Sequence, residues 1–313
     1  MIAVGIFCIR GIFMNKTTFA SLAALTGYGI FGISFLFSKI ALEQASPFVL
    51  LAVRFPVAFL LLNLVILLFR IPFSLKGKPV RMLLVLGFVE PVVYFICENF
   101  GIAMTTASFS GIMLGTIPVF GLLLGRLILK APITPFQWVC AACSLGGVAL
   151  TSAGGEVGFS ALGVALLLGA AVTAALFNVL STDLSRQFSA VERTYIMLAL
   201  GCAVFPLIAL AQNRGDLSAF LVPLSSPSFW GAVLYLAGLS SVGAFFLLNF
   251  AMSHISIARS SVFANFSTVI SVLAGVLILG DDFSPAQVVG VVVITLSVLG
   301  VSLSGNGKKM NKA

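Results

Sequence analysis

The sequence predicts an all-α integral membrane protein, because it is strongly hydrophobic, poor in charge and divided into long apolar segments. Of its 313 residues, 60% are hydrophobic and 8% are charged, and its mean hydropathy is +1.19. Soluble globular domains carry about 25% charged residues, so this chain has too few polar side chains to cover a surface that faces water. Most side chains therefore have to face lipid or one another.

Ten segments are long and apolar enough to cross a bilayer as helices. The hydrocarbon core is about 30 Å thick, which requires about 20 residues of α-helix. The apolar character is continuous, without the alternation typical of a membrane β-barrel. The segments are Phe19–Ile40, Pro47–Phe69, Val80–Ile102, Ala107–Leu129, Thr134–Ser152, Ala161–Ser181, Thr194–Ala211, Phe229–Phe250, Ser260–Leu279 and Ser284–Ser304.

The distribution of Lys and Arg predicts the orientation, because positive residues are retained on the cytoplasmic side during insertion. With a cytoplasmic N-terminus, fourteen of the 17 fall in cytoplasmic segments. Lys39 and Arg214 lie toward the outside, and Arg54 lies within a span. We therefore expect both termini in the cytoplasm. The net charge of +8 reflects this topology, so we expect membrane lipids as partners and no nucleic acid.

An internal repeat of about 150 residues divides the chain into two halves. The segment from Asn99 to Leu150 aligns without a gap with the segment from Asn249 to Gly300, and 13 of the 52 positions are identical. The identities include both Asn-Phe pairs, Gly125 with Gly275, and a Pro-x-Gln in each segment. A duplication is the better interpretation.

Each half contains five spans, so the second half enters the membrane inverted relative to the first. Inverted repeats are typical of secondary transporters, in which one half rocks against the other around a site near the midplane. We expect a cytoplasmic segment at 1–18, of which 1–13 is a candidate for a mis-assigned start, a first five-helix repeat at 19–152, an outer linker at 153–160, a second five-helix repeat at 161–304 and a basic cytoplasmic tail at 305–313.

Several short motifs, in order, resemble EamA-type carriers of the drug/metabolite transporter superfamily. They are the stretch from Tyr28 to Phe35 with Lys39, then Ser46-Pro47, Arg54-Phe55, Asn99 to Ala103, Ala107-Ser108, Pro118 and Leu127 to Leu129, and the pattern returns from Asn249. The resemblance implies a ten-helix carrier with inverted repeats, whose central cavity lies between the first four helices of each half. It also implies small organic solutes, such as amino acids, which are often exported.

Two positions depart from that family pattern. The family commonly has a Gly-Glu pair after the fourth and ninth helices, where this chain has Lys130-Ala131 and Gly280-Asp281. Only the second half thus keeps an acid there. The proline of the ninth helix is Thr268, whereas Pro118 is present in the fourth.

Three charged residues stand out within the predicted spans because they lie away from the span ends, and a charge near the centre costs at least ~2.5 kcal/mol and needs a partner or a wet cavity. Glu90 lies roughly 18 Å from the outer end of its span, near the midplane, Glu98 is shallower, and Arg54 lies roughly 10 Å deep. We interpret Glu90 as a proton-coupling group or a contact for a substrate amine. Arg54 is either a buried anchor that pairs with Glu98 or with carbonyls freed by Pro56, or a substrate contact.

Other polar residues are candidates for the same site. Tyr94 shares a helix face with Glu90 and Glu98 through its spacing of four, and Asn99 follows directly. The remaining candidates are Tyr28, Asn178, Asn249 and Asn265. For Tyr94 the alternative is ordinary packing, and for the amides it is hydrogen bonding between helices.

The cysteines and the single histidine do not indicate a metal or a cofactor. Cys140 and Cys143 form a C-x-x-C in an apolar span with no acid or histidine nearby, which favours packing. His254 lies in a predicted loop without a companion. We expect no cofactor and no metal.

The sequence thus predicts a transporter and not an enzyme, since neither H-E-x-x-H nor G-x-S-x-G is present. We expect a secondary transporter that moves small organic metabolites, amino acids or related solutes, outward across a bacterial inner membrane by alternating access. Short loops and the absence of a transit segment favour that membrane. The alternatives are a facilitative channel and a lipid-handling membrane protein, and a homodimer is left open.

Overall fold

The computed structural model describes residues 16–129, 133–153, 160–255, 257–282 and 284–304. These residues form helices and connecting loops, with no strand among them. The elements are α2 (Lys16–Leu42), α3 (Pro47–Phe69), α4 (Val80–Gly87), η1 (Phe88–Val93), α5 (Tyr94–Ala103), α6 (Ala107–Leu114), α7 (Ile117–Leu129), α8 (Pro135–Ala153), α9 (Ala161–Leu184), α10 (Ala190–Gln212), α11 (Ser218–Leu224), α12 (Pro227–Leu234), η2 (Tyr235–Ala244), α13 (Phe245–Met252), α14 (Ile257–Ala274), η3 (Gly275–Leu279) and α15 (Pro285–Ser304). The expectations for 1–13, for most of the linker and for the basic tail lie outside the described residues.

All ten predicted segments are helical in the structure. Seven of the described helical stretches are long and apolar enough to cross a membrane, and they coincide with the first four predicted spans and with the sixth to eighth. The other three are shorter apolar helices, at Pro135–Thr151, Phe263–Leu279 and Pro285–Val301. The prediction of an all-α membrane protein is confirmed.

Two features differ from the sequence prediction. The short helix α11 lies in a segment for which no element is expected. Helix α10 begins at Ala190 and not at Thr194, because Ser189 and Glu192 form the two reciprocal hydrogen bonds of a capping box. Arg193, a loop residue in the prediction, is therefore part of a helix, and its side chain is fully buried.

The third and eighth predicted spans each change helical geometry near the middle. In the third span α4 and α5 meet at a kink in η1, where Glu90 has an extended backbone (φ −144°, ψ 114°) and Pro91 follows. In the eighth span the π-helical segment η2 lies between α12 and α13. Interrupted helices and π-helical segments are both frequent at functional sites, so these two segments indicate where a site is to be sought.

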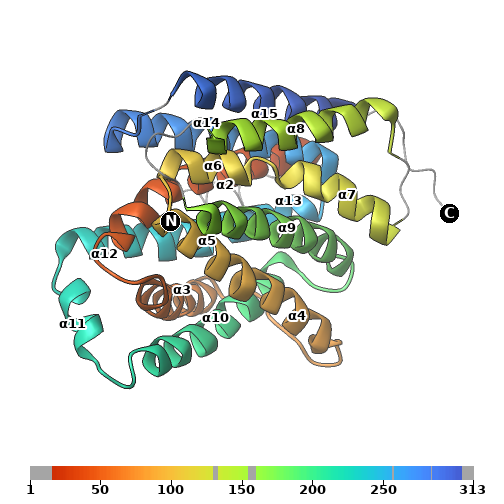
Figure 1. The fold of residues 1–313 in the computed structure, drawn as a ribbon. Coiled ribbons are helices and arrows are strands. Elements are labelled where there is room, and N and C mark those ends of the chain that lie inside the picture. Colours follow the sequence, from red (N-terminus) through yellow and green to blue (C-terminus); the bar gives the residue numbers. More distant parts are fainter. Residues whose placement is uncertain (1–15, 130–132, 154–159, 256, 283, 305–313) are drawn as a thin grey trace.

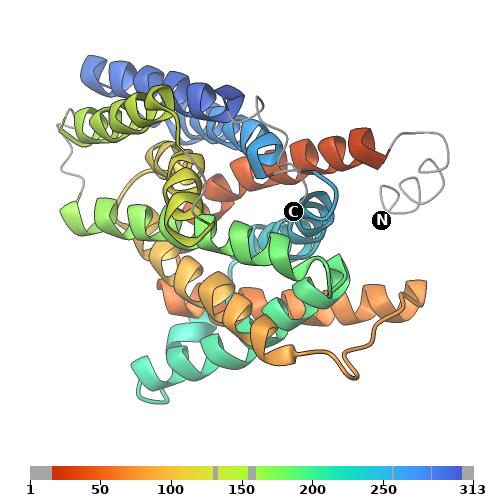
Figure 2. The ribbon, with the colours of Figure 1, turned by 90° about the vertical axis from the view of Figure 1, so that its right-hand side faces the viewer.

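Helices that are distant in the sequence pack together in pairs. α8 and α15 lie side by side along the upper edge of Figures 1 and 2. Gly147 and Gly290 permit this, because neither has room for a side chain against the facing helix. α3 and α10 form a second pair, α2 packs against α13 and α14, and α9 packs against α5 and α7.

One end of the bundle is identified by Lys39, near the end of α2. Its Nζ donates to the carbonyl oxygens of Ile102 and Thr105, at the end of α5, over 3.2 and 2.5 Å. Gln44, in the following turn, donates to Ser228 at the start of α12 over 2.9 Å. We call this end the Lys39 end. Because α5 ends here and α12 begins here, the third and eighth predicted spans run in opposite directions.

The opposite end is held by an ion pair between Lys78 and Glu192, with Nζ and Oε2 2.6 Å apart, and we call it the Lys78 end. The pair joins the loop after α3 to the first turn of α10. Phe19 of α2 and Phe250 of α13 meet edge to face at the same end, with ring centres 5.5 Å apart.

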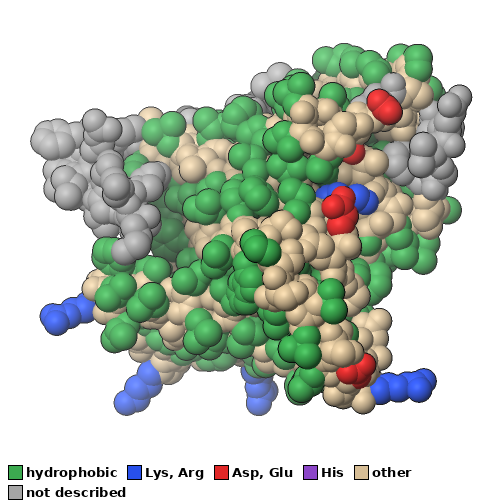
Figure 3. Space-filling view, turned by 90° about the vertical axis from the view of Figure 1, so that its left-hand side faces the viewer, with side chains coloured by type: hydrophobic (Ala, Val, Ile, Leu, Met, Phe, Trp, Pro, Cys, Tyr) green, Lys and Arg blue, Asp and Glu red, His purple; other side chains and the backbone are tan. Residues whose placement is uncertain are grey.

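Apolar side chains cover the outside of the bundle. Figure 3 shows hydrophobic side chains over most of one face, with Lys and Arg side chains projecting from its lower edge. Leu67, Leu127 and Leu277 are each about three-quarters exposed, at 76%, 76% and 77%. Apolar surface this extensive is typical of a protein in contact with a membrane.

Candidate functional site

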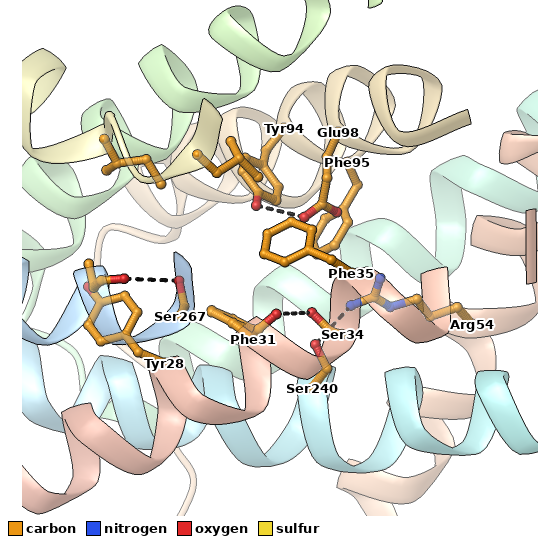
Figure 4. A pocket seen from close by; sticks show the side chains of 13 residues that line it. Tyr28, Phe31, Ser34, Phe35, Arg54, Tyr94, Phe95, Glu98, Ser240 and Ser267 are labelled. Carbon is orange, nitrogen blue, oxygen red and sulfur yellow. Dashed lines mark hydrogen bonds between the residues drawn. The ribbon is translucent and has the colours of Figure 1, made fainter. Parts of the chain in front are cut away.

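A small cavity lies inside the bundle between α2, α3, α5, η2 and α14 (Figure 4). Its volume is about 40 Å³. At roughly 10–15 Å³ for each water, it has room for a few water molecules and not for a metabolite. Its walls are mainly apolar and aromatic, with a few polar groups, as is usual for small-molecule sites. The lining residues are Tyr28, Phe31, Ser34, Phe35, Arg54, Tyr94, Phe95, Glu98, Leu114, Ile117, Ser240, Ala264 and Ser267.

Arg54 reaches this cavity from α3 and is 1% exposed. Its Nε donates to Ser241 over 3.0 Å and its Nη2 donates to Ser240 over 3.2 Å. The guanidinium carbon lies 4.5 Å from the centre of the Phe95 ring, which is a cation–π contact. A guanidinium has five N–H donors, and these two hydrogen bonds are its only ones to described residues. Donors are therefore left for a ligand.

Glu98 reaches the same cavity from α5 and is also buried. Its Oε1 accepts a hydrogen bond from the Tyr94 hydroxyl over 2.8 Å, and its Oε2 accepts one from Asn99 over 3.4 Å. The Lys78–Glu192 contact is the only ion pair in the described part of the chain. Arg54 and Glu98 therefore do not form a direct ion pair in the structure, although the two charges attract one another electrostatically.

Glu90 lies at the break in η1 and is 5% exposed, but it does not line the cavity. Within the described residues it has neither a hydrogen bond nor an ion pair. It interacts electrostatically with Tyr28, Tyr94 and Glu98, all of which line the cavity. Glu90 is thus a buried carboxyl beside the cavity.

The four candidate amides lie outside the cavity wall. Asn249 is fully buried, accepts a hydrogen bond from Ser181 over 2.8 Å and donates one to Thr194 over 3.0 Å, so it joins α13 to α9 and α10. Asn99 donates to the Phe95 carbonyl over 2.9 Å. Asn178 in α9 is partly buried, and Asn265 lies in α14. For Asn249 the geometry favours the alternative of hydrogen bonding between helices.

Arg193 completes a polar cluster with Asn249 near the Lys78 end. Its guanidinium donates to the Ser181 carbonyl, the Asn249 carbonyl and the Ser253 hydroxyl over 2.6 to 2.7 Å. The cations Arg193 and Lys39 thus each bind carbonyls in the last turn of a helix, where positive charge is favourable.

The serines around Arg54 are the part of the site that sequence reasoning missed. Ser240 and Ser241 are fully buried in η2, 186 and 187 residues from Arg54. Serine is common in membrane helices, where its hydroxyl usually bonds to its own helix, so the sequence offers no signal for this role.

Comparison with known proteins identifies the family. The EamA-like transporter family matches residues 18–153 and 161–303. The uncharacterized transporter YcxC of Bacillus subtilis (strain 168) is 33% identical over 295 residues, which cover 93% of this chain and 95% of YcxC. The uncharacterized inner membrane transporter YedA of Escherichia coli (strain K12) is 26% identical over 293 residues, covering 91% and 90% of the two chains.

A solved crystal structure shares the fold. It aligns with a TM-score of 0.67 at 18% identity, covering 94% of this chain and 99% of its own. The family match and the relatives indicate a multi-pass membrane transporter and not an enzyme. Since the family covers both halves of the chain, this protein belongs to the EamA-like transporter family.

Proposed function

We propose that this protein is a secondary transporter that exports small zwitterionic metabolites, of the amino acid type, across a bacterial inner membrane by alternating access. The Lys39 end faces the outside and both termini face the cytoplasm. The relative YedA is itself named an inner membrane transporter, which supports the location.

The observation that carries the substrate class is the pair Arg54 and Glu98. The two opposite charges line one buried cavity without forming an ion pair. Buried charges are costly unless they are paired, so a ligand with its own carboxylate and ammonium is stabilised between them. Arg54 binds the carboxylate through its remaining N–H donors, and Glu98 accepts from the ammonium. The rings of Phe31 and Phe95 contact the substrate side chain.

Two phenylalanine pairs support the inverted repeat. Phe55 and Phe205 differ by 150 residues, and their ring centres are 4.9 Å apart. Phe95 and Phe245 also differ by 150 residues, and their ring centres are 6.0 Å apart. In two halves related by a pseudo-twofold axis, equivalent residues meet at that axis. The opposite directions of the third and eighth spans agree with this arrangement.

Alternating access is supported by the size of the cavity. A space of about 40 Å³ cannot admit a metabolite, so the helices around it have to separate for binding and release. The kink in η1 and the π-helical segment η2 lie beside the cavity, and interrupted helices at the site are typical of other carriers with inverted repeats.

Glu90 provides the proton coupling in this proposal. It is a buried carboxyl without a hydrogen bond or ion pair among the described residues, and it interacts electrostatically with Tyr28, Tyr94 and Glu98. Binding and release of a proton at Glu90 changes the charge beside the cavity, which makes substrate binding depend on protonation. No cofactor takes part in this scheme.

The function is tested with purified protein in liposomes loaded with an unlabelled amino acid. Addition of a trace of the same labelled amino acid outside should give transient, saturable accumulation through exchange. Linear uptake that does not saturate would identify a channel. Absence of exchange across a panel of amino acids, amines and carboxylates would contradict the proposed substrate class.

Glu90→Gln tests the coupling in the same liposomes. We expect exchange without a gradient to continue, while the stimulation of transport by an imposed pH gradient is lost. Asp282→Asn, which neutralises an exposed acid at the Lys39 end, is the control and should keep that stimulation. If Glu90→Gln responds to the gradient as the control does, Glu90 has no coupling role.

A further inference from the structure

Asp281, directly after the ninth predicted span, joins the two halves at the Lys39 end. Its Oδ2 accepts a hydrogen bond from the backbone N–H of Ser108, in the first turn of α6, over 3.0 Å. The first N–H groups of a helix lack partners within the helix, and its N-terminus carries partial positive charge, so a carboxylate is stabilised there. The Lys39 ammonium is close enough to attract the same carboxylate.

The packing around this hydrogen bond is tight. Gly275 of η3 contacts Ser108 and Asp281 so closely that it has no room for a side chain. Further along the same pair of helices, Gly111 packs against Ser271 and Gly115 against Thr268. The Thr268 hydroxyl also donates to the Gly111 carbonyl over 3.2 Å. The helices α6 and α14, with η3, therefore pack without a gap from Asp281 to the level of Thr268.

Among the described residues, two glycines of the fourth span lack such packing at the Lys78 end. Gly121 and Gly125 of α7 have no described atom within 4 Å of the point where a side chain would begin. Gly125 is the repeat equivalent of Gly275, which is tightly enclosed. The repeat equivalent of Asp281 is Ala131, which has no carboxylate.

We propose that Asp281 is a gating residue that holds the Lys39 end of the cavity shut, and that the gate is one-sided because its repeat equivalent is an alanine. The inference rests on the proposed alternating access. To open this end, η3 has to move away from α6, which breaks the hydrogen bond from Ser108 and exposes the cavity. Transporters without the acid at this position would spend more time open at this end.

The test measures access to the cavity from each side of the membrane. A reporter cysteine replaces Ser34, which lines the cavity, in protein whose five natural cysteines are serines. A maleimide that cannot cross membranes is applied to intact cells and, separately, to inverted membrane vesicles. Asp281→Asn is compared with Asp281→Glu, which keeps the charge, and with Asp282→Asn, which makes the same charge change one residue away.

For Asp281→Asn we expect labelling from the Lys39 side to rise about tenfold and labelling from the Lys78 side to fall, because a charge-assisted hydrogen bond that favours one state is lost. The two control variants should stay near the parent. Equal rates in Asp281→Asn and Asp282→Asn would overturn the proposal. A rise from both sides would also overturn it, since it indicates general loosening and not the opening of one end.

The measurement needs no substrate, so its result is separable from that of the transport assay. If the labelling shifts while no amino acid is exchanged, the gate holds and the proposed substrate class fails. If amino acids are exchanged while the labelling does not shift, the gate fails and the proposed function stands.

Discussion

The two halves proposed as an inverted repeat differ in charge at corresponding positions of the sequence. Residues 150 apart pair Arg54 with Val204, Glu90 with Ser240, and Glu98 with Leu248. In each of these three pairs the ionisable side chain belongs to the first half, and its counterpart in the second half is a hydroxyl or an apolar side chain. This difference suggests that the first half carries the chemistry and that the second half positions it.

The buried cation of the second half has a different role from Arg54. Arg193 binds carbonyl and hydroxyl oxygens of α9 and α13, away from the cavity wall. Arg54 is held by two serines of the second half, and its guanidinium lines the cavity. We therefore expect substitutions on the cavity wall to affect transport unequally in the two halves.

The largest effect is expected from Arg54→Gln. Removing the charge that binds the substrate carboxylate should lower the ratio of maximal exchange rate to apparent KM by at least ~30-fold, since losing one partner of a buried charge contact costs about 2 kcal/mol or more. The control is Val204→Leu, at the corresponding position of the second half, which should keep most of the activity. Similar losses in the two variants would show that both halves contribute alike.

A smaller loss is expected from Glu98→Gln. The amide keeps the shape and one acceptor oxygen but loses the charge that holds the ammonium, so the same ratio should fall by about tenfold. Leu248→Met, the matched change in α13, should have little effect. Inhibition by the carboxylic acid that lacks the amino group should weaken less than substrate transport does, and an equal loss for both would argue against a contact with the ammonium.

The smallest effect is expected from Ser240→Ala. Arg54 keeps its hydrogen bond to Ser241, so the loss of one hydroxyl should cost about 1 kcal/mol, or roughly fivefold in exchange. Ser225→Ala, on an exposed turn before the same span, should be indistinguishable from the parent. If the two serine variants behave alike, the second half does not position Arg54.

The positions of the helices were predictable from the sequence because the thickness of the hydrocarbon core sets their length. The start of α3 at Pro47 follows from its preceding Ser46 cap, and the prediction agrees. The start of α10 was missed, because its capping box contains Glu192, and charged residues reduce apparent hydropathy. When Ser189-x-x-Glu192 is interpreted as a capping box, the predicted start of α10 moves to Ala190 and Arg193 falls inside the helix.

The site was only partly predictable. Arg54, Glu98, Tyr94 and Tyr28 line the cavity, and they were candidates because polar groups are costly in a membrane span. What the sequence cannot show is how they pair. Arg54 donates to the hydroxyl groups of distant serines, and Glu98 accepts from the hydroxyl group of Tyr94. The partners of Arg54 depend on the tertiary packing of η2 against α3.

The central claim is that Arg54 and Glu98 bind one zwitterion between them, and the most direct measurement is the melting temperature of the purified protein with matched ligands. An apolar amino acid, the amine that lacks its carboxylate and the acid that lacks its amino group are compared at equal concentration. A ligand that binds the folded state raises the melting temperature. We expect a rise with the amino acid alone, and loss of that rise in both Arg54→Gln and Glu98→Gln. An equal rise with the amine or the acid, or a rise that persists in both variants, would contradict it.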